Sequence, residues 1–237
     1  MNQHKQTAKK TKRPVGRPRA DGRPHLTEGD VFGPAAKLIA RHGFAGTSMR
    51  ALAAELKVTP ASLFHLFKNK EDLLNRLICF AATPSIAFYE RIRARKEKPG
   101  VLLYKSLYEE VLLVASADRA VPALFYLPEL AHEGFGPAQT ARRTMIGHYE
   151  MLIRQGVAEG MFEPVDPALT AEQFFQLTET SILAGPGAQK MPPDAQACAT
   201  AKLCLRAILK KTSKLEAIAR EAEALDDHID VRDFTTK

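Results

Sequence analysis

The 237-residue sequence lacks tryptophan, has only three cysteines and contains no run of 18 apolar residues. Without such a run, no membrane-spanning helix is expected. No apolar stretch follows the basic N-terminus, so it does not resemble a secretory signal. Cys79, Cys198 and Cys204 are scattered without metal-ligand spacing, and we interpret them as reduced core thiols of a cytoplasmic protein.

Residue patterns typical of active sites are also missing. The sequence has no Ser-His-Asp, Cys-His or paired-carboxylate arrangement at a recognisable spacing, and no glycine-rich phosphate loop. His132 with Glu133, and His148 with Glu150, do not have the spacing of metal ligands on a helix. We therefore expect a protein that is not an enzyme and has no cofactor or metal site.

Positive charge is concentrated at the N-terminus. Residues 1–25 carry eight basic side chains and one acidic side chain, which accounts for the whole formal net charge of +7. Basic and acidic side chains cancel over residues 26–237, and 45% of the chain is apolar, which is enough for a folded core. A neutral globular part with a basic tail indicates a polyanionic partner.

The basic segment 12–25 contains Gly16-Arg17-Pro18 and Gly22-Arg23-Pro24. Each proline blocks helix formation and keeps the backbone extended, and an extended segment with arginines fits a narrow minor groove. The segment is similar to an AT-hook in which Arg17, Arg19 and Arg23 contact DNA; a generic basic linker is the alternative. Because residues 1–11 also lack periodicity, we expect residues 1–25 to form a disordered basic arm.

Residues 26–75 predict three short helices and the start of a fourth. Thr27 is the expected N-cap of the first helix and Gly43 its stop, whereas Pro34 should kink or shorten it. Apolar residues at helical spacing indicate this helix: Val31, Phe32, Ala35, Ala36, Leu38 and Ile39.

The next three helices begin at capping residues. Ser48 after Thr47 begins the second helix, and Thr59 followed by Pro60 begins the third. Asn69 begins a fourth helix that should run to about Arg95. Two short helices joined by a tight turn can place one helix in the major groove of DNA.

Beyond Pro99 the sequence has helical periodicity, without a strand pattern or an internal repeat. We predict an all-α protein with a helix-turn-helix domain at residues 26–75 and a helical effector-binding and dimerisation domain at residues 76–237. The helices predicted after Pro99 cover residues 100–117, 120–132, 137–160, 167–184, 193–211 and 214–226.

Residues 31–77 resemble the DNA-binding domain of the TetR family of bacterial transcriptional regulators. Three positions depart from the family pattern: Lys57 stands in place of Gly, Phe64 in place of Tyr and Pro34 in place of Ala. Phe64 keeps a ring contact but no phosphate-binding hydroxyl, and a positive φ at Lys57 would add strain. The matching residues are Ala35, Gly43-Phe44, Thr47-Ser48, Leu52-Ala53, Val58, Ser62-Leu63-Phe64, Phe67, Lys70-Glu71 and Leu73.

The resemblance implies that the third helix lies in the major groove and that neighbouring residues contact the DNA backbone. A solvated face without DNA contacts is the alternative for these polar residues. The expected contacts, in addition to the three arginines of the arm, are Ser48, Arg50, Thr59, Ala61, Ser62, Phe64, His65 and Lys70.

One recognition helix reads few base pairs, so we expect a homodimer on a palindromic operator. The dimer should form through the helices near 167–184 and 193–211, because the second is apolar nearly all round and needs two partners. Complete burial of that helix within a monomer is the alternative. Its apolar residues are Ala195, Ala197, Ala199, Ala201, Leu203, Leu205, Ile208 and Leu209.

The resemblance also implies a small-molecule effector pocket in residues 100–180, whose occupation would move the fourth helix and respace the two recognition helices. Aromatic residues make up only 7% of the chain, which favours a smaller or more specific effector. Release of repression is the common outcome in the family, and activation is the alternative. Candidate effector residues are Tyr104, Tyr108, Phe125, Tyr126, His148, Phe174 and Gln176, with His132, Phe175 and Glu179 as further polar or aromatic groups.

An architectural protein is the competing function. Such a protein would bind A·T-rich DNA through its arm, with little further specificity and no effector. A regulator should instead prefer a palindrome by orders of magnitude, so competition with bulk DNA distinguishes the two.

Overall fold

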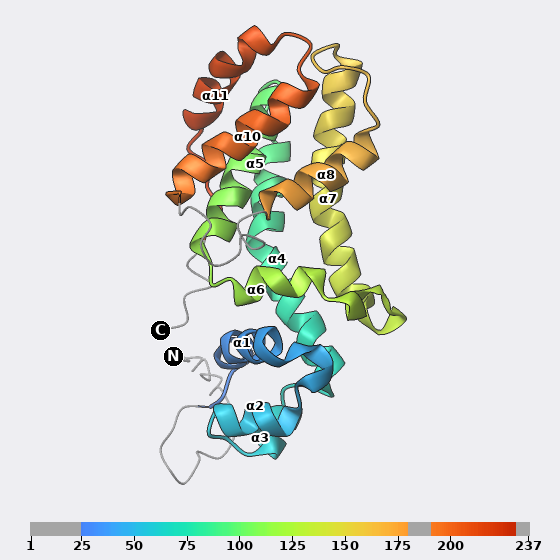
Figure 1. The fold of residues 1–237 in the computed structure, drawn as a ribbon, viewed down its shortest axis with the longest axis vertical. Coiled ribbons are helices and arrows are strands. Elements are labelled where there is room, and N and C mark those ends of the chain that lie inside the picture. The colour runs from blue at the N-terminus through green and yellow to red at the C-terminus, as the bar shows by residue number, and fades with distance from the viewer. Residues whose placement is uncertain (1–24, 180–190, 231–237) are drawn as a thin grey trace, which may run out of the picture.

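The computed structural model describes residues 25–179 and 191–230, and the regular elements within these ranges are helices. α1 (Glu28–Gly46), α2 (Met49–Glu55) and α3 (Pro60–Phe64) gather at one end of the molecule, and α4 (Lys70–Arg93) leads from them into the larger helical part (Figure 1). The all-α prediction is confirmed. The basic arm, with Arg17, Arg19 and Arg23, lies outside the described residues.

The ends of α1 follow the sequence prediction, whereas its interior does not. Thr27 forms a capping box with Asp30: its Oγ1 accepts the Asp30 N–H at 3.3 Å, and the Asp30 carboxylate accepts the Thr27 N–H at 2.8 Å. Gly43, at φ 70°, ends the regular helical geometry. The expected shortening at Pro34 is wrong, because the backbone stays helical through it. Proline removes only one intrahelical hydrogen bond here, and buried side chains on either side hold the helix in place.

The caps of the next three helices are confirmed. Each cap accepts a backbone N–H within the first turn of its helix, which satisfies a donor that has no intrahelical partner. The bonds join Ser48 Oγ to Ala51 N at 3.1 Å, Thr59 Oγ1 to Ser62 N at 3.2 Å, and Asn69 Oδ1 to Asp72 N at 2.7 Å.

The larger part surrounds α5, which packs against α7, α10 and α11 (Figure 1). α7 also packs against α4 and α8. The elements are α5 (Pro99–Ser116), α6 (Ala120–Ala123), α7 (Gly136–Ala158), α8 (Pro167–Thr178), α10 (Pro193–Ile208) and α11 (Leu215–Glu223).

The single helix predicted at 120–132 is wrong. α6 has only four residues and is followed by three short 3-10 turns at Leu124–Tyr126, Pro128–Ala131 and Glu133–Phe135. Pro128 lacks an N–H donor and disfavours helical geometry in the residue before it, so the helix cannot continue past Leu127, which is extended. The predicted end of α8 at residue 184 falls in 180–190, outside the described residues.

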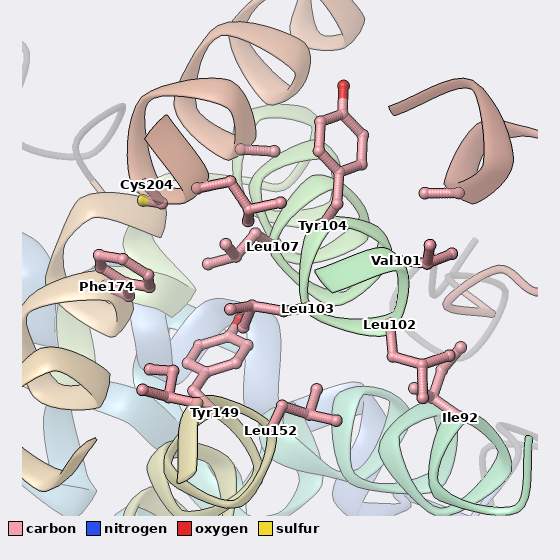
Figure 2. Packing of buried hydrophobic residues seen from close by; sticks show 14 of the residues in the cluster. Ile92, Val101, Leu102, Leu103, Tyr104, Leu107, Tyr149, Leu152, Phe174 and Cys204 are labelled. Atoms are coloured by element: carbon pink, nitrogen blue, oxygen red, sulfur yellow. The ribbon is translucent and has the colours of Figure 1, made fainter. Parts of the chain in front are cut away.

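Two apolar clusters form the core. The first joins α5 to the helices around it and includes Leu103, Leu107 and Leu152 (Figure 2). The second joins α1–α4 to residues that follow α5, among them Leu124 and Phe135. The helix-turn-helix end therefore shares its core with α6 and the 3-10 turns, and movement of α6 must affect α1.

Candidate DNA interface and ligand cavity

The third helix presents one face to the core and the other to solvent. Leu63 is fully buried, whereas Ala61 and His65 are exposed and the Phe64 side chain is 52% exposed. Thr59 is exposed at the N-cap, with its hydroxyl 3.0 Å from the half-buried Ser62 Oγ. Phe64 therefore presents its ring to solvent on the same short helix as the exposed Ala61.

On α2, Arg50 and Ser48 both lie on the exposed side. Ser48 Oγ already accepts the N–H of Ala51, but its hydroxyl proton can still be donated to a phosphate. Arg50 brings a permanent positive charge next to α3. The structure thus places both residues where the sequence predicted outward contacts.

Lys70 lies differently from the expected phosphate contact. Its Nζ donates to the carbonyl oxygens of Phe44 at 2.6 Å and Thr47 at 3.0 Å, and it lies 4.3 Å from the centroid of the Phe44 ring. Two of its three donors are therefore used within the protein. The side chain ties the end of α1 to the start of α4 and supports the interface from behind.

The turn between α2 and α3 contains Lys57 at φ 55°, the one non-glycine residue with positive φ in the described ranges. Its N–H donates to Ala54 O at 3.1 Å, which closes α2 before Thr59 begins the next helix. The positive φ that would strain a lysine is therefore present at this glycine-like position.

A second exposed apolar surface lies on α8 and α10. Leu169 and Leu203 are 59% and 58% exposed. One side of α10 packs on the core through Ala201 and Leu205, and the exposed Ala199 and Leu203 lie on the other. Complete burial of this helix within the monomer is therefore wrong, and the apolar outer face has no partner within the described part of the chain.

A cavity of about 320 Å³ opens among α4, α5, α6, α7 and the end of α8. Its lining is apolar apart from one serine and three carboxylates. The residues are Ala81, Glu110, Leu113, Val114, Ser116, Ala117, Asp118, Val121, Pro122, Phe125, Met145 and Glu179.

Of the seven main effector candidates, only Phe125 lines this cavity. Tyr126 lies beside it and close enough to Glu179 to lower the pKa of that carboxyl group against the larger, opposite effect of burial. Gln176 is exposed on α8 and does not reach it, and Phe174 is buried in the core (Figure 2). Helical spacing alone could not distinguish the cavity face of each helix from its core face.

Tyr104 and Tyr108 also lie away from the cavity. The Tyr104 hydroxyl lies 3.5 Å from Cys198 Sγ and 3.3 Å from Glu223 Oε1, between α5, α10 and α11. The Tyr108 ring stacks on Tyr104 with a centroid distance of 6.3 Å. They do not line this cavity, because this face of α5 is covered by α10 and α11.

His148 is a core residue. Its ring stacks on Tyr89 at a centroid distance of 4.0 Å, and its Nε2 lies 2.8 Å from Ser106 Oγ. Arg93 Nε donates to Nδ1 at 3.4 Å. Burial, with a smaller contribution from the Arg93 charge, lowers the pKa of His148 to about 3, so the ring is neutral and is not free to bind an effector.

Two carboxyls that reach the cavity are almost completely buried. Glu110 accepts the Tyr89 hydroxyl at 2.7 Å, and burial raises its pKa. Burial raises the pKa of Glu179 to about 8, against the opposing hydrogen bond from Tyr126. Glu110 was missed from the sequence, although a glutamate within the apolar run of α5 was the available signal.

Asp118 connects the rim of the cavity to α1. Its carboxylate accepts the Ala120 N–H at 3.1 Å and pairs with Lys37 Nζ at 3.1 Å. Val121 and Pro122 of α6 line the cavity while α6 packs on α1. The cavity is thus in mechanical contact with the helix-turn-helix end through α6 as well as through α4.

No group of three or more His, Cys, Asp or Glu side chains within residues 25–179 and 191–230 has the arrangement of a metal site. None of the helices described is both long and apolar enough to cross a membrane.

The capped α2–turn–α3 unit with its exposed third helix defines a helix-turn-helix DNA-binding protein. Residues 34–77 match the family model "Bacterial regulatory proteins, tetR family". Over these residues the chain has the DNA-binding domain of TetR-family transcriptional regulators.

Relatives and solved structures agree with this assignment. The transcriptional regulator UidR of Escherichia coli K12 is 24% identical over 199 residues, which cover 81% of this chain and 84% of UidR. AmtR of Mycobacterium smegmatis has the same fold, with a TM-score of 0.69 and 23% identity over 89% of this chain and 100% of that chain. AibR, solved with isovaleryl coenzyme A and operator DNA, has a TM-score of 0.61 and 22% identity over 74% of this chain and 96% of that chain.

Proposed function

We propose that this protein is a dimeric repressor that binds a palindromic operator. It is released when a small molecule occupies the cavity among α4, α5, α6, α7 and the end of α8, which we call the α4–α8 cavity. The exposed outer face of α3 is the observation that carries the DNA-binding part. Residues 26–75 act as the DNA-binding domain, residues 76–237 bind the effector and the second subunit, and residues 1–25 add minor-groove contacts. AibR supports this arrangement by analogy, since it was solved with both an acyl-coenzyme A and operator DNA.

We divide the proposed DNA contacts into those with base edges and those with the sugar–phosphate backbone. Ala61, Ser62 and His65 read base edges in the major groove, where alanine can contact a thymine methyl and serine can donate or accept. Ser48, Arg50, Thr59 and Phe64 contact the sugar–phosphate backbone and set the position of α3. Lys70 acts indirectly by holding α4 against the end of α1.

The dimer forms through the outer faces of α8 and α10. Leu169 and Leu203 supply the apolar centre of a self-complementary surface, and Gln173 and Gln176 supply polar contacts beside it. Leu203→Glu should give monomers in sedimentation at micromolar protein, whereas Ala158→Glu, on an exposed position of α7, should leave the dimer intact. Monomeric wild-type protein under these conditions would contradict the proposal.

Ligand binding in the cavity changes the position of the DNA-binding end through two helices, α6 and α4. Occupation of the cavity displaces α6 and α4 together, because Val121 and Pro122 line it on one side and Ala81 on the other. Asn75 extends the α4 route: its side chain donates to Gly134 O at 2.8 Å and accepts the Ala138 N–H at 3.2 Å. The effector can shift DNA binding only by its differential affinity for the two states.

Selection of binding sites from a random duplex pool, in moderate salt with bulk competitor, tests the proposal. We expect enrichment of a palindrome, loss of that enrichment in Ala61→Glu and retention in Ala87→Glu, an exposed control on α4. Enrichment of A·T tracts alone would favour the architectural function. Deletion of residues 1–25 should weaken binding and flatten its salt dependence; an unchanged slope would remove the arm from the interface.

A further inference from the structure

The lining of the α4–α8 cavity contains acids but no bases. Glu110, Asp118 and Glu179 contribute carboxyl groups, and none of its described lining residues is Lys, Arg or His. The remaining surface is mainly apolar, with Leu113, Phe125 and Met145 among its side chains. These carboxyl groups can accept hydrogen bonds from a cationic donor, whereas no described lining residue offers a positive charge to an anionic ligand.

Glu179 leaves hydrogen-bonding capacity unused inside the cavity. Its side chain is only 3% exposed, and its Oε2 has no hydrogen-bond partner. Burial raises the pKa of this carboxyl group, and the nearby Tyr126 hydroxyl lowers it by less. A buried oxygen without a partner is costly, so a donor that enters the cavity gains a hydrogen bond that the empty protein does not make.

The end of α5 reinforces this preference for a donor with positive charge. Leu113, Val114 and Ser116 line the cavity within the last turn of this 18-residue helix. The carbonyl groups at a helix C-terminus carry partial negative charge and favour cations nearby. Glu110 lies on the same helix, one turn earlier, so the helix end and the carboxyl act on the same side of the cavity.

We propose that the cavity selects a hydrophobic organic amine whose ammonium N–H donates to Glu179 Oε2 and whose apolar body lies against Leu113, Phe125 and Met145. This inference rests on the proposed function only in taking the cavity as the effector site. The volume of about 320 Å³ corresponds to roughly ten water-sized groups at about 30 Å³ each. A small arylalkylamine fits this space.

Binding of an ammonium should release a proton from the protein. Burial and the Glu110 and Glu172 charges raise the pKa of Glu179 to about 8, against the opposing effects of Tyr126 and Arg142. At pH 7 the empty site therefore holds Glu179 largely protonated. An ammonium beside Oε2 favours the carboxylate, so the proton leaves to solvent and amine binding tightens as pH rises towards 8.

The test uses calorimetric titration of the full-length protein with 4-phenylbutylamine, 4-phenylbutanol and 4-phenylbutanoate, which share one apolar body. We expect the amine to bind at least about tenfold more tightly than either analogue, as a charge-assisted hydrogen bond requires. Titration at pH 7 in buffers of different ionisation enthalpy should show release of a proton with the amine alone. Glu179→Gln should weaken amine binding about tenfold and abolish that release, and Glu110→Gln should weaken it without abolishing the release.

Glu150→Gln, on α7 and outside the lining, is the matched control and should bind the amine as wild type does. Equal or tighter binding of the butanol or butanoate, failure of all three probes to bind, or unchanged amine affinity in Glu179→Gln would overturn the proposal. Operator binding separates this result from the proposed function. Selective amine binding without loss of operator affinity would support the amine site but contradict effector release, whereas operator binding without amine selectivity would overturn the amine site alone.

Discussion

The ammonium of Lys70, the first residue of α4, bonds the carbonyl oxygens of Phe44 and Thr47, which lie at the end of α1 and directly after it. These carbonyls are near the start of α2, so one side chain joins three helices of the DNA-binding end. We infer that a lysine whose charge is engaged in this way holds α3 in position rather than binding a phosphate.

Lys70→Met should therefore lower stability while leaving the electrostatics of DNA binding intact. Loss of a charged hydrogen-bond donor to two carbonyls should cost about 1–3 kcal/mol, measured by urea unfolding. The log–log salt slope of operator affinity should not change, whereas Arg50→Gln should reduce the slope by about 1. Lys68→Met, at an exposed neighbour, should change stability by less than about 0.5 kcal/mol. A reduced slope with unchanged stability in Lys70→Met would instead identify a phosphate contact.

Lys57 should be a site where a single substitution stabilises the protein. Its φ of 55° is costly for a residue with a Cβ and natural for glycine. Lys57→Gly should raise the free energy of unfolding by about 1 kcal/mol, whereas Ala54→Gly, three residues earlier on an exposed face of α2, should lower it by about 1 kcal/mol. If Lys57→Gly destabilises the protein as Ala54→Gly does, the turn is not strained.

Substitution by alanine at two glycines of α7 should change the stability of the protein in opposite directions. A Cβ on Gly156 would lie 2.2 Å from the Phe162 ring, whereas a Cβ on Gly147 would meet nothing within 4 Å. Phe162 is fully buried, so its ring cannot move away easily. Gly156→Ala should destabilise by about 1–3 kcal/mol through overpacking, and Gly147→Ala should stabilise by about 0.5–1 kcal/mol through helix propensity. Thermal unfolding of both variants checks this, and stabilisation by both would contradict the close packing at Phe162.

Much of the fold could be predicted because its signals are local. Thr27, Ser48, Thr59 and Asn69 each cap the helix assigned to them, since a capping side chain acts within one turn of its own backbone. Pro34 was misjudged because the cost of one lost hydrogen bond depends on the tertiary packing around it. The helix predicted at 120–132 failed for a different reason: apolar periodicity continues through the 3-10 turns, and the prediction neglected the local break at Pro128.

The cavity was harder to predict than the DNA-binding surface. The exposed face of α3 follows from which side of a short helix is apolar, and the burial of Leu63 agrees with that pattern. Tyr104 and Phe174 were chosen by residue type, but their places depend on which helices cover α5 and α8. Glu110 was not identified from the sequence, and only the packing of α5 shows that it is buried.

Acid should destabilise the protein through His148. Arg93 donates to its Nδ1, so the ring proton lies on Nε2 and is donated to Ser106 Oγ, which in turn donates to Leu102 O at 2.8 Å. Protonation of Nδ1 would remove the acceptor of the Arg93 hydrogen bond and place a second positive charge beside Arg93. This agrees with a folded-state pKa of about 3 for His148.

The unfolded chain should bind this proton near pH 6.5, well above the folded pKa. The unfolded state therefore holds more protons between these values, and the contribution of His148 is complete above pH 6.5 and is lost as pH falls towards 3. The slope from this group should approach 1.4 kcal/mol per pH unit. His148→Gln cannot take up the proton, so its stability measured by thermal unfolding from pH 7.5 to 4 should fall less steeply than that of wild type. Parallel curves for the two proteins would mean that His148 titrates alike in both states.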